Sequence, residues 1–584
     1  MCGITVSVIQ NQDATQCSRE VWDTLCISNA KRGPDWSATH TVTHHNGTIL
    51  TFAASVLHMR GDHPTRQPHV SAAGDVLCWN GEIFDGLQIG STDNDGTLLF
   101  GSLTSTESSL EVVDALSRIE GPYALVYYSA HEDAVYFARD PLGRRSLLHR
   151  GNTDRQTAFM LSSTSAGALT SDFDEVSTEF IFRLPIATIY HHIITSRWHC
   201  QGDLEALPRI GQDPDSFVTS LLLNTTVPPP QDPLGSHDML PAELSAAIGH
   251  LIEHLDRSVH LRVQHVPRLP REMTPGVSTT ARIGILFSGG LDSTILARLA
   301  DRHVPQDEPI DLLNVAFENP RKLQAQIRFK SQGKGKGKKT SISLEVPSST
   351  SAYDAPDRLT GREEVEELRR LSPHRQWNFV EVNVPYGETQ ATRPTVEQLM
   401  HPSKSVMDLS LALALYFASR GRGSIRNGEG ISEPYQSNAR VLLSGLGADE
   451  LLGGYSRHKK AFYTTDWIGL IAELQLDLTR LPTRNLGRDD RIISSHGKES
   501  RYPFLSLGVV AFLAALPVHV KLDPRLGDGL GDKMLLRLAA KELGLVEASS
   551  RRKRAMQFGS QSARMEEGSS RRGDQTLDVT ATEP

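Results

Sequence analysis

The sequence predicts two folded domains, an α+β domain built on layered antiparallel sheets followed by an α/β domain with a parallel sheet. At about 150 residues per domain, the 584 residues of the chain allow two to four domains. Hydrophobic residues make up 39% of the chain and charged residues 22%, which is typical of a globular protein. Strand-like runs dominate the first 200 residues, whereas strands and helices alternate after residue 240.

The first domain is expected over residues 2–200. It contains short β-branched and aromatic runs separated by turn residues, and these are ITVSVIQ, TILTFAASVLHM, VLCWNGEIF, YALVYYSA and AVYFARD. One helix is expected, over about residues 106–119. Residues 201–240 follow as a linker, because DPDS, VPPPQDP and GSHD disfavour both helix and central strand.

The second domain is expected over residues 241–565. Its opening run, residues 241–263, has apolar residues at helical spacing, and three apolar runs read as buried strands: RIGILF, PIDLLNVAF and ARVLLSG. Helical runs such as DSTILARLADR and VMDLSLALALYFASR alternate with them, which favours a parallel sheet covered on both faces. Residues 331–340 form a solvated Lys/Gly insertion, and residues 566–584 are expected to be a disordered tail.

Charge and cysteine content exclude several classes of protein. The net charge of −8 gives no reason to expect nucleic acid as a partner. The sequence contains no run of 18 apolar residues and its first ten residues lack a basic n-region, so we expect a cytoplasmic protein that does not act on membranes. The five cysteines form no CxxC pair, which argues against a disulfide framework and a thiolate zinc site.

Cys2 is the first residue with chemical potential. Removal of Met1 would leave one residue carrying both a thiol and a free α-amine, whose pKa is about 7.7–8.0. Such an amine can act as base for a thiol with a pKa of about 8.5. Taken alone, Cys2 is more simply a small apolar residue that opens an edge strand.

Further strings change that balance. RGPD, LHMR, WNGEIF, DNDG and ARDPLGRRSL follow Cys2 in order, and together they resemble the class II, N-terminal-nucleophile (Ntn) glutamine amidotransferases over about 150 residues. The resemblance implies an Ntn-type fold in which Cys2 is the nucleophile and Asn80 and Gly81 form the oxyanion hole. It also implies that glutamine is bound by its carboxylate at Arg60 and by its amine at Glu82 and Asp95. DNDG offers Asp93 as well, and Asp95 is preferred for its distance from the following LLF run.

A second site is expected where RIGILF is followed by SGGLDS and a helical run. A glycine-rich turn at a helix N-terminus exposes backbone N–H groups and favours an anion such as phosphate. GxxxxGK[ST] is absent at this turn, so a simple P-loop ATPase is disfavoured. The plain alternative is a tight turn that binds nothing.

SGGLDS resembles the PP-loop of ATP pyrophosphatases. LLSGLGADELLGGYSRH, GKESRYPFLS and GDKMLLRLAAKELGL resemble the synthetase half of glutamine-dependent asparagine synthetases, and other strings, such as DRLTGREEVEEL and RRKRAMQFGS, look like a divergent branch of that family. The resemblance implies ATP and Mg²⁺ as cofactors. The nucleotide-binding residues that it implies are Leu286, Ser288, Gly289, Gly290, Asp292, Ser293, Val315, Ser444, Gly445 and Lys533, with Asp292 and Asp449 as Mg²⁺ ligands.

The resemblance breaks at two positions. The family's SGEGADE loop reads SGLGADE here, so Leu446 replaces the glutamate thought to handle the proton of ammonia, and Ser506 replaces the Asp of FLD. A leucine cannot accept a proton. We therefore expect a glutamine-hydrolysing, ATP-dependent ligase that amidates aspartate or another carboxylate. The alternatives are that Glu450 substitutes as base, that the acceptor is not aspartate, or that the paralogue binds its ligands without turnover.

Overall fold

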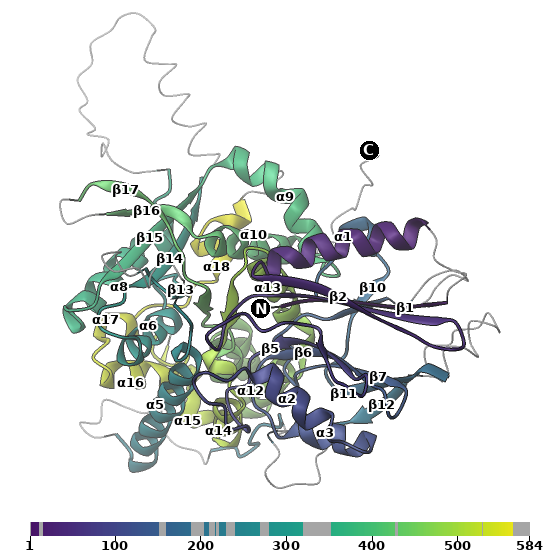
Figure 1. Ribbon diagram of the computed structural model, residues 1–584. Helices are drawn as coiled ribbons and strands as arrows, with labels where there is room; N and C mark the ends of the chain where they lie inside the picture. The colour runs from purple at the N-terminus through teal and green to yellow at the C-terminus, as the bar shows by residue number, and fades with distance from the viewer. Residues whose placement is uncertain are drawn as a thin grey trace, which may run out of the picture.

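The computed structural model describes residues 2–10, 16–150, 159–187, 204–209, 217, 221–228, 240–268, 280–318, 352–426, 430–527 and 529–564. The expected Lys/Gly insertion at 331–340 and the expected tail at 566–584 lie outside these residues. In Figure 1 the first part of the chain, in purple and blue, forms one half of the molecule, and the start of β1 lies at the junction with the other half.

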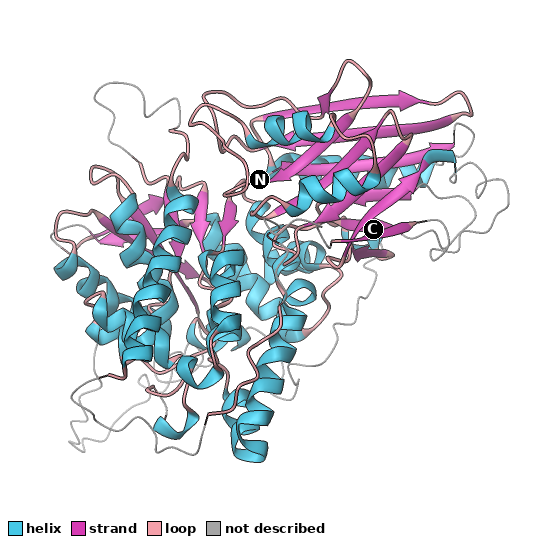
Figure 2. Cartoon of the chain, turned by 90° about the horizontal axis from the view of Figure 1, so that it is seen from below, coloured by secondary structure: helices cyan, strands magenta, loops and turns pink. Residues whose placement is uncertain are grey.

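Two antiparallel sheets form the N-terminal half. The first has the order β10 (Phe173–Glu175), β8 (Leu148–Arg150), β9 (Phe159–Ser162), β1 (Cys2–Gln10), β3 (Thr48–Val56), β2 (Trp36–Thr43). The second has the order β12 (Glu205–Pro208), β11 (Phe180–Pro185), β7 (Ala134–Arg139), β6 (Tyr123–Ser129), β5 (Val76–Gly81), β4 (His69–Val70). Figure 2 shows these strands gathered on one side of the molecule.

Alternating side chains decide how these layers stack. Ile4, Val6 and Val8 of β1 pack against Val76 and Cys78 of β5, so the core lies between the two sheets. The opposite face of the second sheet is covered by α2 (Asp95–Leu103) and α3 (Ser109–Ser117). The outer face of the first sheet is covered by α1 (Gln16–Arg32), and a 3₁₀ turn, η1 (Gly167–Thr170), lies nearby. The expected helix near 106–119 is found as α3, whereas α1 was not expected.

The second sheet also extends past the expected domain end at residue 200. Strand β12 pairs with β11 in antiparallel register, from Phe180 opposite Pro208 to Arg183 opposite Glu205. Arg209 then donates hydrogen bonds to the Thr178 carbonyl, at 2.6 Å, and to the Tyr123 hydroxyl, at 2.9 Å. Part of the segment expected as linker therefore belongs to the N-terminal half, because backbone pairing and Arg209 fix it there.

The C-terminal half is an α/β domain around a mixed sheet. Its order is β17 (Ser432–Gln436), β16 (Arg422–Arg426), β15 (Trp377–Val384), β14 (Ile310–Phe317), β13 (Ile283–Leu286), β18 (Val441–Leu443), β19 (Glu499–Arg501). The five neighbouring strands β15, β14, β13, β18 and β19 are parallel to one another. Strand β16 pairs with β15 in antiparallel orientation, and β17 pairs with β16 in the same way. Every residue of β14 is buried, as expected for a parallel strand with both faces covered.

Helices cover both faces of this sheet. One face packs against α5 (Ala242–Val263), α6 (Leu291–His303) and α8 (Pro356–Leu371), and the other against α9 (Tyr386–Met400), α10 (Val406–Arg420) and α13 (Leu486–Ser494). The remaining helices are α11 (Ala448–Leu452), α12 (Ser456–Arg484), α14 (Leu507–Ala515), α15 (Val518–Lys521), α16 (Met534–Glu542), α17 (Val546–Ser549) and α18 (Met556–Gly559), with 3₁₀ turns η3 (Pro503–Leu505), η4 (Pro524–Leu526) and η5 (Ser562–Arg564).

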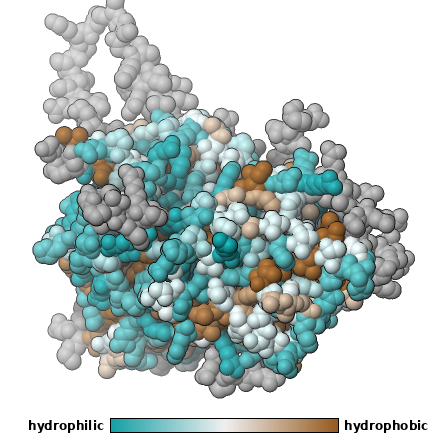
Figure 3. Space-filling model, viewed as in Figure 1, coloured by the Kyte–Doolittle hydropathy of each residue, from teal (hydrophilic) through white to brown (hydrophobic). Residues whose placement is uncertain are grey.

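The surface is mostly hydrophilic on the face seen in Figure 3, with smaller hydrophobic areas between the hydrophilic ones. Within the described ranges, no single helix is long and apolar enough to cross a membrane. One bent pair, Leu507–Ala515 with Val518–Leu526, meets the length and composition criteria. Several residues of α14, including Leu507, Val510 and Leu513, are buried in the core.

Candidate active sites

Cys2 lies at the beginning of β1 and is buried. Its backbone N–H donates to Oδ1 of Asn80, at 2.9 Å. Asn80 thus accepts a hydrogen bond through Oδ1, whereas Nδ2 of the same buried amide has no hydrogen-bond partner. Burial raises the pKa of the Cys2 thiol, while the positive amino terminus opposes that rise. The thiol therefore needs an adjacent base, and the amide that accepts from the Cys2 nitrogen has an unpaired N–H donor.

Gly81 follows Asn80 on β5. A Cβ atom at this position would lie 2.6 Å from Cζ2 of Trp79 and 2.8 Å from Cβ of Tyr123, so no larger residue fits. Gly81 lines a small cavity together with Cys2, Arg60, Glu82 and Asp95. The cavity measures about 20 Å³, room for about one water molecule, so glutamine would enter only if side chains moved.

The three expected glutamine-binding residues meet in this cavity. Nε of Arg60 lies 3.3 Å from Oε2 of Glu82, and Asp95 accepts from the Ile83 N–H at 3.0 Å. Burial and the neighbouring Asp95 raise the pKa of Glu82 to about 7, against the opposing charge of Arg60. Burial also raises the pKa of Asp95. By contrast, Asp93 is exposed and accepts a hydrogen bond from the Gly90 N–H, so the geometry favours Asp95.

Two further residues touch Cys2 that sequence reasoning gave no role. Nε2 of Gln67 lies 3.6 Å from the Cys2 sulfur, and its Oε1 accepts from the Trp79 N–H. Arg32 donates from Nε to the Cys2 carbonyl, at 3.3 Å, and from Nη2 to Asp490, at 2.8 Å. Arg32 belongs to the RGPD string, which was one signal for it, whereas nothing in the sequence singles out Gln67.

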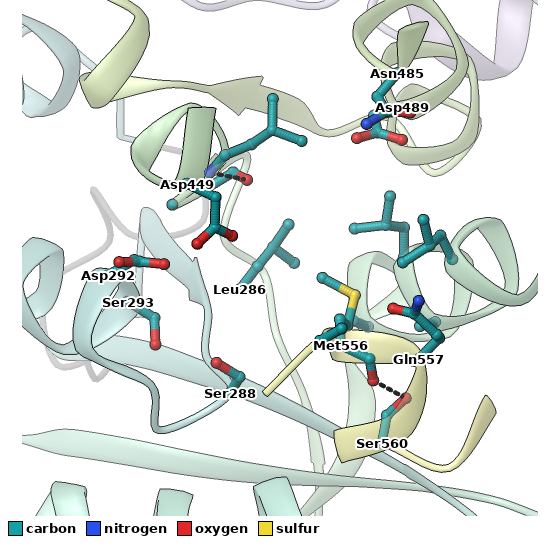
Figure 4. Close-up of a pocket in the computed structure, with 18 of the residues that line it drawn as sticks. Leu286, Ser288, Asp292, Ser293, Asp449, Asn485, Asp489, Met556, Gln557 and Ser560 are labelled. Atoms are coloured by element: carbon teal, nitrogen blue, oxygen red, sulfur yellow. Dashed lines mark hydrogen bonds between the residues drawn. The ribbon is translucent and has the colours of Figure 1, made fainter. Parts of the chain in front are cut away.

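The second site is a cavity of about 780 Å³ in the C-terminal half. Figure 4 shows Asp292, Ser293 and Asp449 on one side of it, Met556 and Gln557 on the other, and Leu286 between them. Leu286 and Val315 line it from β13 and β14, and Ser288, Asp292 and Ser293 from the turn into α6. The strand-to-helix turn expected to bind phosphate thus opens into a cavity large enough for a nucleotide.

Glycines allow the close packing of this turn. Gly289 has φ +73°, and a Cβ atom there would lie 2.4 Å from the Gly361 nitrogen of α8. Gly290 is the N-cap of α6. A second loop joins β18 to α11 and brings Ser444 and Gly445 to the same cavity, where a Cβ atom on Gly445 would lie 2.8 Å from the Asp292 Cβ. The two loops therefore touch.

Lys533 joins the carboxylates in the first turns of α6 and α11. Its Nζ lies 2.7 Å from Asp292 and 2.6 Å from Asp449, and Lys553 also pairs with Asp449. Burial opposes charge on Asp449, but the two lysines outweigh it and hold its pKa well below the usual range. For Lys533 the sequence implied contact with phosphates; the structure places its ammonium between the two expected metal ligands.

These residues also fit Mg²⁺. Two carboxylates and the hydroxyls of Ser288 and Ser293 line one cavity, and such hard oxygen donors are those that Mg²⁺ prefers. Across the described ranges, no cluster of three His, Cys, Asp or Glu side chains could hold a metal on its own. The metal would therefore need nucleotide oxygens in addition to Asp292 and Asp449.

Leu446 lines the same cavity and is partly buried. Glu450, which follows Asp449 in the sequence and also lines the cavity, is buried and accepts a hydrogen bond from the Tyr455 hydroxyl at 2.5 Å. Burial, followed by the charge of Asp449, raises the pKa of Glu450. Sequence reasoning missed a further acid, Asp357 of α8, which lines the cavity and whose pKa burial raises to about 7. Asp357 begins the string DRLTGREEVEEL. That string indicated the family but did not indicate that Asp357 lines the cavity.

Comparison with known proteins finds a matching family model in each half of the chain. A glutamine amidotransferase domain model matches residues 1–191, and an asparagine synthase model matches residues 464–581. Asparagine synthetase domain-containing protein 1 from Homo sapiens is 38% identical over 97% of this chain and 96% of its own length. The chain belongs to the asparagine synthetase domain-containing protein 1 family.

Two further relatives are similar to this chain over most of its length. Asparagine synthetase domain-containing protein 1 from Gallus gallus is 36% identical over 97% of this chain and 98% of its own. Glutamine-hydrolysing asparagine synthetase 1 from Saccharomyces cerevisiae is 31% identical over 88% of this chain and 76% of its own. The expected family and the expected succession of an Ntn-type domain and an α/β synthetase domain are therefore confirmed, while the roles of individual residues stay predictions.

Proposed function

We propose that this member of the asparagine synthetase domain-containing protein 1 family is a cytoplasmic amidotransferase that hydrolyses glutamine and uses ATP with Mg²⁺ to amidate aspartate or another carboxylate. The observation that carries the proposal is the pairing of Cys2 with Asn80. The backbone nitrogen of Cys2 donates to Oδ1 of Asn80, and Nδ2 of the same amide has no partner and is free to donate.

The first half-reaction follows from this geometry. After loss of Met1, the α-amine of Cys2 accepts the thiol proton, and the thiolate attacks the amide carbon of glutamine. Asn80 Nδ2 and the Gly81 N–H would donate to the oxyanion, each donor lowering the barrier by about 3 kcal/mol. The α-ammonium returns its proton to the leaving nitrogen, and collapse of the tetrahedral intermediate releases ammonia and leaves a glutamyl thioester, which water hydrolyses to glutamate.

The second half-reaction uses the cavity of the C-terminal half. The N–H groups at the start of α6 and the ammonium of Lys533 would hold the β- and γ-phosphates of ATP. The acceptor carboxylate displaces pyrophosphate from the α-phosphate, and ammonia then attacks the acyl-adenylate to give an amide and AMP. Mg²⁺ bound at Asp292 and Asp449 would neutralise phosphate charge.

A second candidate function rests on Leu446. A paralogue that keeps glutamine and nucleotide binding, but amidates a different carboxylate or none, would not need the proton acceptor that asparagine synthesis is thought to use. Product analysis with glutamine, ATP and a panel of carboxylates separates the two. Asparagine as the main amide supports the first function, and another amide, or ATP binding without any amide, supports the second.

The experiment that tests the glutaminase half is Cys2→Ala. It should abolish glutamine hydrolysis and leave ATP affinity unchanged, since the nucleophile and nucleotide cavity lie in different halves. Cys26→Ala, which removes another free cysteine, is the control and should keep activity. Hydrolysis that survives in Cys2→Ala would refute the proposal, and intact-mass measurement showing Met1 retained in active protein would refute the α-amine mechanism.

A further inference from the structure

Strand β19 lies between the two candidate sites. Its residue Arg501 is opposite Leu443 of β18, and its carbonyl accepts from the N–H of Ser444, at 2.9 Å. Ser444 begins the second loop of the nucleotide cavity. All three residues of β19 are buried. The backbone of Arg501 is therefore fixed to the synthetase half.

The side chain of Arg501 points to the other half. Its Nη2 lies 3.7 Å from Oε1 of Glu82, the carboxylate expected to meet the amine of glutamine. Nε lies 2.6 Å from Glu499 and Nη1 2.7 Å from the carbonyl of Arg262, and the guanidinium lies 5.3 Å from the ring centroid of Phe84. These contacts leave the buried guanidinium little freedom, so it presents a fixed cation to Glu82.

Burial and four charged groups determine the state of Glu82. Asp95 and Glu499 favour its neutral form, whereas Arg60 and Arg501 favour its ionised form, and burial with Asp95 brings its pKa to about 7. A glutamine carboxylate that engaged Arg60 would draw that guanidinium away from Glu82, to which it is now paired. Arg501 would then be the remaining cation of this group beside Glu82.

We propose that Arg501 is a positioning residue for glutamine: from the synthetase half it favours the ionised form of Glu82 and holds that carboxylate toward the substrate amine. The proposal rests on the proposed glutaminase function. Arg501 touches no reacting atom, and its effect on glutamine passes through Glu82. Completion of the glutamine pocket thus depends on a strand that also holds the nucleotide loop.

The test measures glutamine affinity by calorimetry in the full-length Cys2→Ala protein, where no turnover occurs. Arg501→Met should weaken binding about tenfold near pH 7, and Arg501→Lys, which keeps the charge, should restore most of it. Without the cation the pKa of Glu82 rises further, so less of it is ionised at pH 7 and more as pH increases. The defect of Arg501→Met should therefore shrink between about pH 6.5 and 8.5.

A double-mutant cycle separates this role from a structural one. Once Glu82→Gln has removed the carboxylate, Arg501→Met should weaken glutamine binding little further. Arg257→Met is the matched control, because Arg257 also reaches from the C-terminal half to an N-terminal carboxylate, Asp85, but at an exposed position. Unchanged ATP affinity reports that each variant is folded.

Two results would count against the inference, and they differ. If Cys2→Ala protein binds no glutamine, the proposed function fails and the inference fails with it. If it binds glutamine but Arg501→Met has no effect, or has an effect that adds fully to that of Glu82→Gln at every pH, the inference alone fails.

Discussion

At the scale of single residues, the C-terminal cavity holds the groups expected to bind phosphate and metal, but it carries a leucine where a proton acceptor is expected. Asp292 and Asp449 both pair with Lys533, and Asp449 also pairs with Lys553. Leu446, on the loop that leads into α11, lines the cavity with an apolar side chain. Activation of a carboxylate by ATP requires phosphate-binding and charged groups, whereas rapid attack by ammonia requires a base.

The unaltered protein should therefore form asparagine slowly or not at all, and Leu446→Glu should raise the rate. General-base assistance is worth about 10²–10⁴-fold, so even partial recovery is measurable as asparagine formed per unit time. A carboxylate placed in this partly apolar wall would have a raised pKa, so the gain should grow from about pH 7 to 9.

Leu446→Gln is the control for that experiment. It matches glutamate in size and polarity but cannot accept a proton, so it should not raise the rate. An equal gain from glutamine would assign the effect to polarity. Asparagine formation by the unaltered protein at the rate of an ordinary asparagine synthetase would show that Leu446 is no obstacle.

At the scale of elements, the turn from β13 to α6 depends on one glycine. Gly289 has a positive φ, and its Cα faces the backbone of Gly361 on α8. Gly289 thus lets the loop approach the helix closely, and the approach fixes the N–H groups at the start of α6. A side chain on Gly289 would meet this backbone and displace the turn, whereas a Cβ atom on Gly361 would meet Asn314 and Phe379 instead.

Gly289→Ala should weaken ATP binding at least tenfold and destabilise the protein by about 1–3 kcal/mol, because a residue with a left-handed backbone conformation would then carry a Cβ atom. Nucleotide affinity and the thermal midpoint measure the two effects, and glutamine hydrolysis at a temperature where the variant is folded should remain. Gly508→Ala is the control, since its Cβ atom would meet nothing within 4 Å. Full ATP affinity in Gly289→Ala would remove this turn from the binding site.

At the scale of the whole molecule, buried polar contacts join the two halves. Arg32 pairs with Asp490 at 2.8 Å, and Arg491 pairs with Glu175 at 2.7 Å. Arg144 also donates to the Leu505 carbonyl, at 2.8 Å. Such contacts stabilise one arrangement of the halves, since separating the halves would take buried charged groups away from their partners.

Asp490→Asn should lower the thermal midpoint measured by calorimetry. Loss of one partner of a buried ion pair costs about 3–5 kcal/mol, and asparagine keeps only part of the hydrogen bonding. Because Arg32 also holds the Cys2 carbonyl, glutamine hydrolysis should fall as well. Glu253→Gln, which alters an exposed pair with His250, should change neither quantity. An unchanged midpoint in Asp490→Asn would mean that the halves are held together by other contacts.

Local patterns explain which elements were predictable. Apolar runs predicted β1, β3, β5, β6 and β7, since each strand has its own alternation or continuous burial. Helix α1 was missed because few of its residues, among them Val21 and Leu25, enter the core, and its helical pattern is therefore weak. Strand β12 was missed because its exposed sequence, Glu205–Pro208, is a strand only through pairing with β11.

By itself the sequence determined the two domain types, the family and some of the residues that line each cavity, because short motifs impose local backbone geometry and carry their own reactive groups. Only the tertiary structure decided how these groups pair. Lys533 meets Asp292 across 241 positions, and Arg501 meets Glu82 across the domain junction. No local pattern encodes such pairs, since they exist only when distant strands and helices pack and exclude water from the charges between them.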